Sequence, residues 1–593
     1  MRKIGIKIII GILIVAVVAA LVIFGIKMTN KTRINSHTGL LDNYDDGDAA
    51  YDKESATYIT LNGDSIETDS ENVKFKNSTL TIQAEGIYVL SGNLNGNVVV
   101  DVDNETNVRI ILNNANITSS DGSAIYGKNS DKIIITLDEN STNTLEDTSK
   151  YSISDMKATV FSNDDLTING TGTLTVKANY ANAIQSNDSV KIVNGTITIN
   201  AVNNGIVAND DVKIKNGSIN ITSGNDGIKA KNEEDDTKGY VLVEGGNIKI
   251  NAQGDGIQGV NYVEIDNGIL DITTGGGASN TTKTHQENFR QMINQISSNS
   301  EDSESYKGIK AGNNIYIKNG TVNINSADDT LHSNGTLRVE NGTLNISAGD
   351  DGMHADSDLV IDGGNIDIKD SYEGIEGATV TINGGDIKVK TSDDGINVAG
   401  GSDDDKSGFE DPFASNSDNK LTINGGKIYV NSDGDGLDSN GNIYLNDGTV
   451  YVDGPTNSGN GALDYNGEFV QQGGILIAVG SSGMAQAISS NSSVYALSAY
   501  LTSTQSANTK ITLTDESGNE IVSYTPTKSF QHVVIATSSL KNGSKYNLVL
   551  NGTTYESFTI SSRVTTIGSS QNSMGGGQMQ NNFNGNGGMN RGR

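Results

Sequence analysis

Acidic residues recur at a nearly fixed interval through the middle of the chain, each two residues before an aliphatic residue. The aliphatic residues Ile309, Leu331, Met353, Ile375 and Ile396 follow one another at intervals of 22, 22, 22 and 21. The position two residues before each aliphatic residue reads, in successive repeats, Asp226, Asp255, Lys307, Asp329, Asp351, Glu373, Asp394 and Asp435. A second acid precedes this position at Asp328, Asp350 and Asp393. We call this series the acid row.

If the repeats stack like neighbouring strands, carboxylates of the acid row lie about 4.8 Å apart. At that separation they repel one another by somewhat under about 1 kcal/mol in water and by about 3 to 4 kcal/mol at an effective dielectric of 20. Water and salt, protonation or a hard divalent cation can relieve this repulsion, and calcium best fits several carboxylate and carbonyl oxygens. The acids of the row are therefore candidate Ca²⁺ ligands. The alternative is that Asp-Gly pairs are turn formers with solvated carboxylates.

A second row of mostly polar residues lies one residue after each aliphatic residue: Lys229, Gln258, Lys310, His332, His354, Glu376, Asn397 and Asp438. Because side chains alternate along a strand and the aliphatic residue points inward, we expect this outer row to face solvent. Its lysines, Lys229 and Lys310, can bind an acidic ligand, serve as the base of an elimination reaction, or simply pair with neighbouring acids. Its histidines have no third nitrogen ligand, so they indicate exposed polar residues rather than a zinc site.

Aromatic side chains occupy a third position in two of the repeats. Tyr306 and Tyr372 each lie three residues before the aliphatic residue, and the chain contains no tryptophan. A sugar-stacking surface would therefore consist of tyrosine, although aromatic packing at turns explains these residues equally well. The candidate ligand-binding residues are Tyr306, Tyr372, Lys229, Lys310, His332 and His354. No catalytic residue is expected, unless Lys229 or Lys310 acts as a base.

The elements that position these side chains follow from a second repeated phrase. Residues 317–324, 339–346 and 361–368 each contain two alternating segments broken by Asn-Gly or Gly-Gly. Alternation with period two predicts strands, and the glycine permits positive φ. A repeat of about 22 residues with three short strands and three turns predicts an all-β solenoid, the parallel β-helix. We place the β-helix at 158–480, an N-terminal β cap with the first coils at 56–157, and a small C-terminal β module at 494–562.

Composition limits the partners. The 593-residue chain carries a formal charge of -31 and no cysteine, which argues against nucleic acid and anionic lipid surfaces and excludes disulfides and thiolate metal sites. We expect a monomer.

Residues 568–593 are rich in Gly, Asn, Gln and Met and are expected to be disordered. Two longer insertions, 278–305 and 400–418, interrupt the repeat and are expected to form loops beside the solenoid.

The N-terminal segment 1–33 contains 19 uncharged residues, from Ile8 to Ile26, between basic residues. This length is sufficient to span a bilayer, and no small-x-small cleavage site follows it. The pattern predicts an uncleaved N-terminal membrane helix, a polar spacer at 34–55 and a body outside the bacterial cell. A cleaved signal and a secreted protein are the alternative.

Several phrases, taken in order, resemble one known family. They lie at residues 86–92, 162–176, 225–229, 239–241, 254–258 and 272–277, and the similarity runs from about Ala56 to Lys545. The family is that of clostridial-type surface carbohydrate-binding proteins, whose right-handed parallel β-helix resembles that of pectate lyases. The resemblance implies bound Ca²⁺ and non-catalytic binding of plant cell-wall polysaccharide, including acidic pectic chains, with cellulose as a further candidate.

Three classes of function therefore remain open. The first is calcium-dependent binding of a polysaccharide. The second is a calcium-dependent pectate-type lyase, because elimination from a uronate requires a base and a cation that stabilises the developing charge. The third is a structural or adhesion protein of the cell surface. Lysine participation and cation dependence distinguish them.

Overall fold

The structure is a computed structural model, and it describes residues 51–152, 156–281, 305–399 and 418–569. The chain divides into two compact units, Met1–Gly47 and Asp48–Arg593, and all described residues belong to the second. Within these residues the regular structure consists of β-strands and two single turns of 3-10 helix, Lys53–Ser55 and Ala278–Asn280. The predicted all-β class is confirmed.

The prediction of a membrane-spanning N-terminal helix is corrected. Across the described ranges, no helix is long and apolar enough to cross a membrane. The predicted anchor at 1–33 lies outside the described residues, as do most of the spacer at 34–55, the bulk of both insertions and residues 570–593 of the tail. A membrane helix and a membrane partner are therefore not carried further.

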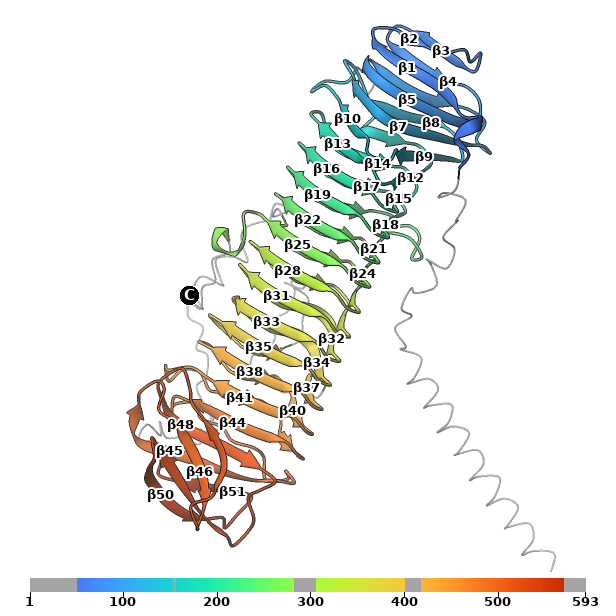
Figure 1. Cartoon of the computed structure of the whole chain (residues 1–593). Coiled ribbons are helices and arrows are strands. Elements are labelled where there is room, and N and C mark those ends of the chain that lie inside the picture. The colour runs from blue at the N-terminus through green and yellow to red at the C-terminus, as the bar shows by residue number, and fades with distance from the viewer. Residues whose placement is uncertain (1–50, 153–155, 282–304, 400–417, 570–593) are drawn as a thin grey trace, which may run out of the picture. The chain divides into compact units, whose positions relative to one another are not determined.

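The body of the molecule is a parallel β-helix, as predicted, with three strands in each coil (Figure 1). Each strand pairs in parallel with the equivalent strands of the coils before and after it. The first column of stacked strands contains β8 (Ile125–Asn129), β11 (Ala158–Ser162), β14 (Asn182–Ser186), β17 (Ile206–Ala208), β20 (Ile228–Ala230), β23 (Ile257–Gly259), β26 (Ile309–Ala311), β29 (Leu331–Ser333), the start of β32 (Met353–Ile361) and of β34 (Ile375–Ile382), β36 (Ile396–Val398), β39 (Leu437–Ser439) and β42 (Leu463–Tyr465).

The other two columns complete each coil. The second contains β9 (Lys132–Leu137), β12 (Asp165–Gly170), β15 (Val190–Ile192), β18 (Asp211–Ile214), β21 (Tyr240–Val243), β24 (Tyr262–Ile265), β27 (Asn314–Ile317), β30 (Thr336–Val339), the ends of β32 and β34, β37 (Lys420–Ile423), β40 (Asn442–Leu445) and β43 (Phe469–Gln471). The third contains β10 (Thr142–Glu146), β13 (Thr173–Ala178), β16 (Thr196–Ala201), β19 (Ser218–Ser223), β22 (Asn247–Ala252), β25 (Ile269–Thr274), β28 (Thr321–Ser326), β31 (Thr343–Ala348), β33 (Asn365–Asp370), β35 (Asp386–Thr391), β38 (Lys427–Ser432), β41 (Thr449–Asp453) and β44 (Ile475–Gly480).

Stacked aliphatic side chains fill the interior of the solenoid. The first-column residues Ile228, Ile257, Ile309 and Leu331 are register partners in successive coils, and each is fully buried. Burying an aliphatic side chain of this size stabilises the fold by about 1.5 to 3 kcal/mol. Because each coil buries its apolar face against its neighbours, the core runs through all the coils.

Two kinds of glycine shape the coils. Gly342, in the Asn-Gly turn between the second and third columns, has φ +110°, and a Cβ there would lie 2.9 Å from the carbonyl oxygen of Gly320. The glycine before each first-column strand has no positive φ; at Gly352 a Cβ would lie 2.6 Å from the Gly374 carbonyl oxygen. That second glycine permits close approach of coils at the turn that carries the acid row.

Irregular strands cover the N-terminal end of the solenoid. They are β1 (Thr57–Gly63), β2 (Ile66–Glu67), β3 (Val73–Lys76), β4 (Thr79–Ile82), β5 (Gly86–Asn95), β6 (Asn97–Asp101) and β7 (Asn107–Thr118). β1 pairs in parallel with β5 and antiparallel with β2, and β3 forms an antiparallel pair with β4. These short antiparallel strands occupy an edge that would otherwise expose a long row of unpaired backbone groups.

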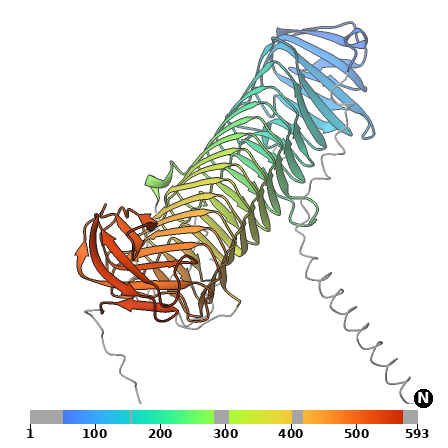
Figure 2. The same cartoon turned by 60° about the horizontal axis from the view of Figure 1, so that its bottom comes forward.

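A two-sheet module follows the last coil (Figure 2). One sheet contains β45 (Tyr495–Gln505), β48 (Phe530–Thr537) and β51 (Val564–Ile567), and the other contains β46 (Ile511–Asp515), β47 (Glu520–Tyr524), β49 (Lys545–Leu550) and β50 (Thr553–Thr559). β48 pairs antiparallel with β44, so the first sheet covers the edge of the final coil. A separate apolar core, which includes Ile477, Phe530 and Leu548, lies between the sheets.

Candidate functional site

The acid row lies at the turn between the third and first columns. Because the aliphatic residues that follow it are register partners from Ile228 to Leu437, the acids two residues earlier stand one above another. The side chains of Asp226, Asp255, Asp328, Asp329 and Asp351 are buried. The remaining acids of the row, Asp350, Glu373, Asp393, Asp394 and Asp435, are partly buried.

Most of these acids have a structural task. Asp226 Oδ1 accepts a hydrogen bond from the backbone N–H of Asp255 at 3.0 Å, and Asp255 Oδ1 accepts one from the N–H of Lys307 at 2.8 Å. In a later coil, Asp394 Oδ1 accepts from the N–H of Asp435 at 2.6 Å. Each carboxylate therefore satisfies a backbone donor of the following coil that would otherwise be buried without a partner. This explains why an acid or an amide suits the position.

Lysine neutralises the middle of the acid row. Lys307 Nζ pairs with Asp329 Oδ2 and lies 3.4 Å from Asp328 Oδ1. One oxygen each of Asp328, Asp329 and Asp350 lie within 4.8 Å of one another. With the buried lysine among them, these three carboxylates fit a cation less well than an acid group without a lysine.

The acids near the C-terminal end of the row form a group without a lysine partner among the described residues. One oxygen each of Asp394, Asp435 and Asp438 lie within 4.8 Å of one another, and no ion pair of the described residues involves them. Burial raises the pKa of Asp394 to about 8, and repulsion from Asp393, Asp435 and Asp438 adds to the shift. Burial likewise raises the pKa of Asp438 to about 7 and that of Asp435 to about 6. Partly buried carboxylates that resist ionisation next to one another fit a hard cation such as Ca²⁺.

A cavity of about 330 Å³ opens at the coils that begin with Ile228, Ile257 and Ile309. Its lining brings together several predicted residues: Asp226, Asp255, Tyr306, Lys229 and Lys310, with Gln258 and Ser305. Lys229 Nζ lies 2.8 Å from Asp226 Oδ2, and Asp255 Oδ1 accepts a hydrogen bond from Ser305 Oγ at 2.7 Å. The cavity thus offers two ammonium groups beside two carboxylates, together with amide and hydroxyl groups and one tyrosine ring, a set suited to a hydroxyl-rich ligand.

The solvent exposure predicted for the outer row is wrong at its histidines and at Asn397, which is also buried. His332 is 5% exposed and His354 is 1% exposed, and their rings stack with centroids 4.7 Å apart. Burial alone lowers the pKa of His354, but hydrogen bonds to Asp351, Asp356 and Glu376 outweigh it and raise the pKa above its ordinary value. Neighbouring acids therefore fill the space that the prediction assigned to solvent, and both rings lie outside the cavity lining.

Tyr372 also lies outside the cavity. It occupies the position of Tyr306 three coils later, at a distance of about 14 Å along the solenoid. Asp328 and Asp350 occupy the same position in the two coils between them. The two tyrosines therefore form no shared stacking platform, and only Tyr306 can contact a ligand in the cavity.

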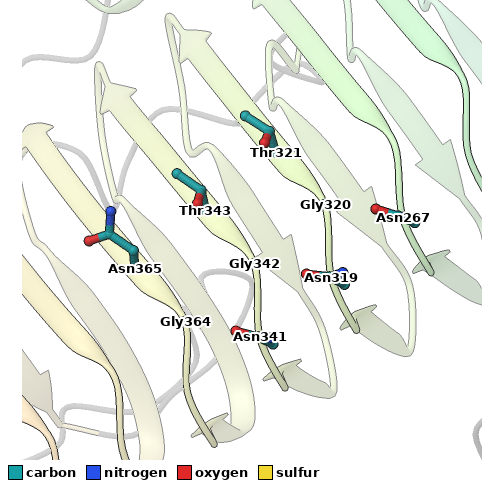
Figure 3. Close-up of a pocket in the computed structure, with 9 residues that line it drawn as sticks. All are labelled: Asn267, Asn319, Gly320, Thr321, Asn341, Gly342, Thr343, Gly364 and Asn365. Carbon is teal, nitrogen blue, oxygen red and sulfur yellow. The ribbon is translucent and has the colours of Figure 1, made fainter.

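A second cavity, of about 580 Å³, lies at the Asn-Gly turns on the other side of the third column (Figure 3). Figure 3 shows Asn319 and Asn341 in equivalent positions on neighbouring coils, beside Gly320 and Gly342. The lining residues carry no charge: Asn267, Asn319, Gly320, Thr321, Asn341, Gly342, Thr343, Gly364 and Asn365. This surface can form hydrogen bonds to hydroxyl groups but has no feature that selects an anion.

Some of the grouped residues were not among the predicted site residues. Glu376 and Asp438 stand in the outer row and were visible there, but side-chain alternation suggested solvent rather than contact with the acids. Asp464 is the register partner of Asp438 in the next coil. It was missed because that coil begins 26 residues after Leu437 instead of about 22.

Comparisons with known proteins find sequence similarity to proteins described as carbohydrate-binding. Residues 76–352 match a family model described as "Carbohydrate-binding domain-containing protein". A protein of that same description from Acetivibrio thermocellus is 37% identical over 150 residues, which make up 24% of this chain and 52% of the relative, so the chain spans about half the length of the curated relative it matches. A solved structure, described as the polysaccharide lyase-like protein from C. thermocellum in a gadolinium derivative, is 36% identical, with a TM-score of 0.37, over 37% of this chain and 92% of that one. Residues 76–352 are thus similar in sequence to proteins described as carbohydrate-binding domain-containing.

Proposed function

We propose that this protein binds acidic plant cell-wall polysaccharide outside the cell, without catalysis and with the help of Ca²⁺. The observation that carries the proposal is the cavity lined by Lys229, Lys310 and Tyr306, which combines cationic, hydrogen-bonding and aromatic groups. Ammonium groups attract uronate carboxylates, and the tyrosine ring offers a face on which a sugar can stack.

The overall charge of the chain requires such local attraction. A protein with a formal charge of -31 repels a polyuronate at long range. The two cavity lysines supply one source of attraction. A Ca²⁺ ion held by Asp394, Asp435 and Asp438 would supply another, because it can bridge protein and ligand carboxylates. The coils of Lys310 and Asp394 are four steps apart, about 19 Å, so one extended glycan chain can reach both.

Retention on immobilised polygalacturonate tests the proposal. We expect binding by the wild-type protein that weakens in Lys229→Ala and Lys310→Ala variants, and weaker retention on neutral glucans. Lys388→Ala is a matched control, because Lys388 is exposed on the third column and away from the cavity. Equal binding by all four proteins would contradict the cavity as the binding site.

Salt and chelator separate the two contributions. Attraction through lysines fades as salt screens it, whereas attraction through Ca²⁺ disappears with chelator and tolerates moderate salt. We expect both dependences, with the chelator effect absent in Asp394→Asn. Absence of retention on any glycan would favour a structural role of the solenoid instead.

A lyase is the second candidate because Lys310 lines the cavity close to Asp255. Lys229 is poorly placed to be the base, since its Nζ is held 2.8 Å from Asp226 Oδ2. A lyase would produce unsaturated ends that absorb ultraviolet light during incubation with polygalacturonate and Ca²⁺. We expect no rise in absorbance; a steady rise that is abolished by Lys310→Ala would establish the enzyme.

A further inference from the structure

The buried histidine His354 is surrounded by carboxylates on both of its ring nitrogens. Its Nδ1 lies 2.6 Å from Glu376 Oε2 and 3.6 Å from Asp351 Oδ2, and its Nε2 lies 3.0 Å from Asp356 Oδ1. Asp351 and Asp356 come from the same coil as the histidine, whereas Glu376 follows on β34 in the next coil. One ligand atom each of Asp351, His354 and Glu376 lie within 4.8 Å of one another.

The carboxylate on Nε2 determines how the ring can act. An ionised carboxylate only accepts hydrogen bonds, so Asp356 requires a proton on Nε2. Nδ1 then faces two carboxylate oxygens. Either a proton bridges Nδ1 to Glu376 Oε2, as their separation of 2.6 Å allows, or the Glu376 side chain moves outward and a metal ion binds the Nδ1 lone pair. A carboxylate that holds the far nitrogen of a histidine is the usual support for a metal-binding imidazole.

The preceding coil provides an internal comparison. His332 has the same arrangement, with Nε2 3.1 Å from Asn334 Oδ1 and Nδ1 2.8 Å from Asp329 Oδ2. There, however, the ammonium group of Lys307 already pairs with Asp329. The coil after His354 instead contributes two further acids, Glu373 and Glu376, so of these two histidines His354 is the one whose neighbouring carboxylates favour a metal ion.

We propose that Asp351, His354 and Glu376 form a binding site for a divalent transition metal ion of the Zn²⁺ type, supported by Asp356. A single imidazolium leaves its three surrounding carboxylates with an excess of negative charge, which a divalent ion reduces. Ca²⁺ takes oxygen ligands, whereas imidazole nitrogen together with carboxylate oxygen suits Zn²⁺ and its neighbours. Glu376 is partly exposed, so an ion can enter from the surface and keep one position open.

Metal analysis of the untagged full chain tests the site. The protein is freed of metal with chelator, dialysed, and titrated with Zn²⁺ or Co²⁺ in the presence of excess Ca²⁺, which blocks sites made of oxygen alone. We expect one Zn²⁺ retained per chain, and Co²⁺ absorption bands that report nitrogen and oxygen ligands. His354→Asn should lower affinity at least 100-fold, and Asp356→Asn, which retains an acceptor on Nε2 as Asn334 does, about 10-fold to 100-fold.

Two variants serve as controls. His332→Asn and Asp394→Asn should retain Zn²⁺ with unchanged affinity, because neither residue belongs to the ligand set. If His354→Asn does not fold, Glu376→Gln replaces it, since the Glu376 side chain is at the surface. No retained Zn²⁺ in the wild type would show that His354 is simply an imidazolium, and retention that survives His354→Asn and Glu376→Gln would place the ion elsewhere; either result overturns the proposal. Because no glycan is present, the result is independent of the proposed function.

Discussion

Removing the carboxylate of Asp394 tests whether electrostatic repulsion within the acid row lowers the stability of the folded protein. In the Asp394→Asn variant the amide oxygen can still accept the hydrogen bond from the Asp435 N–H. The same solenoid already uses this arrangement, because Asn204 Oδ1 accepts from the Asp226 N–H at 2.9 Å. The substitution therefore removes a carboxylate while keeping the backbone contact.

The expected magnitude follows from the raised pKa of Asp394, about 8 in the folded protein. An unfolded aspartate has a pKa near about 3.9, so above pH 6 the unfolded chain is ionised while the folded carboxyl remains largely protonated. Unfolding then releases a proton, and stability falls as pH rises until the folded pKa is passed. The slope is about 1.4 kcal/mol per pH unit well below the folded pKa and half of that at pH 8, so the loss between pH 6 and pH 8 is about 2.3 kcal/mol.

Urea unfolding followed by far-ultraviolet circular dichroism at pH 6, 7 and 8, with chelator present, measures this loss. We expect the wild-type protein to lose stability over this range and Asp394→Asn to lose about 2.3 kcal/mol less. With Ca²⁺ at a hundredfold excess over its dissociation constant, the wild type should gain about 2.7 kcal/mol at pH 8 and the variant much less. Wild-type and variant curves that stay parallel with chelator from pH 6 to 8 would refute the reasoning and leave Asp394 a solvated turn residue.

Three further perturbations test other contacts. Asp453 is fully buried and accepts hydrogen bonds from the hydroxyls of Tyr429, Tyr524 and Thr527. Asp453→Ala should therefore lower the free energy of unfolding by about 3 to 5 kcal/mol and increase protease cleavage near residue 527. Unchanged cleavage would contradict this. Gly342→Ala, with positive φ and a close carbonyl, should lower the thermal midpoint more than Gly518→Ala, which has positive φ but nothing within 4 Å; equal shifts would show that the close contact is harmless. Lys307→Met leaves buried Asp329 without its ammonium partner and should destabilise the fold by about 3 to 5 kcal/mol at pH 8, with partial recovery at pH 5. A loss of stability that does not depend on pH would indicate lost packing alone.

The periodic part of the fold could be predicted from sequence because one rule repeats in each coil. The aliphatic residues at Ile309, Leu331 and Met353 fix the register, since a slip of one residue would turn each of them outward. The Asn-Gly turns were predicted for the same reason, and Gly320 and Gly342 do adopt positive φ. The role of the glycine in the Asp-Asp-Gly phrase was harder to predict. A glycine that is required by the close approach of two coils looks the same in the sequence as a glycine that is required by a special φ.

The site was harder to predict than the fold because burial depends on neighbours across coils. Alternation correctly indicated that His354 points away from the aliphatic interior, but it could not show that Asp356 and Glu376 enclose the ring. The ion pair of Lys307 with Asp329 likewise depends on rotamers that spacing alone does not specify. Sequence periodicity identifies which residues share a row, whereas the contacts across rows require coordinates.

Where a carboxylate of the acid row accepts a backbone hydrogen bond from another coil, the donor belongs to the coil that follows. Asp226 offers its oxygen to the amide of Asp255, and Asp255 in turn offers its own to Lys307. A finished coil therefore presents ready acceptors to the polypeptide that emerges after it, whereas a later coil formed first would hold amides without partners. During synthesis from the N-terminus, each finished coil can thus serve as a template for the coil that follows it. An internal coil whose acid is lost weakens the start of the next coil rather than the end of the one before.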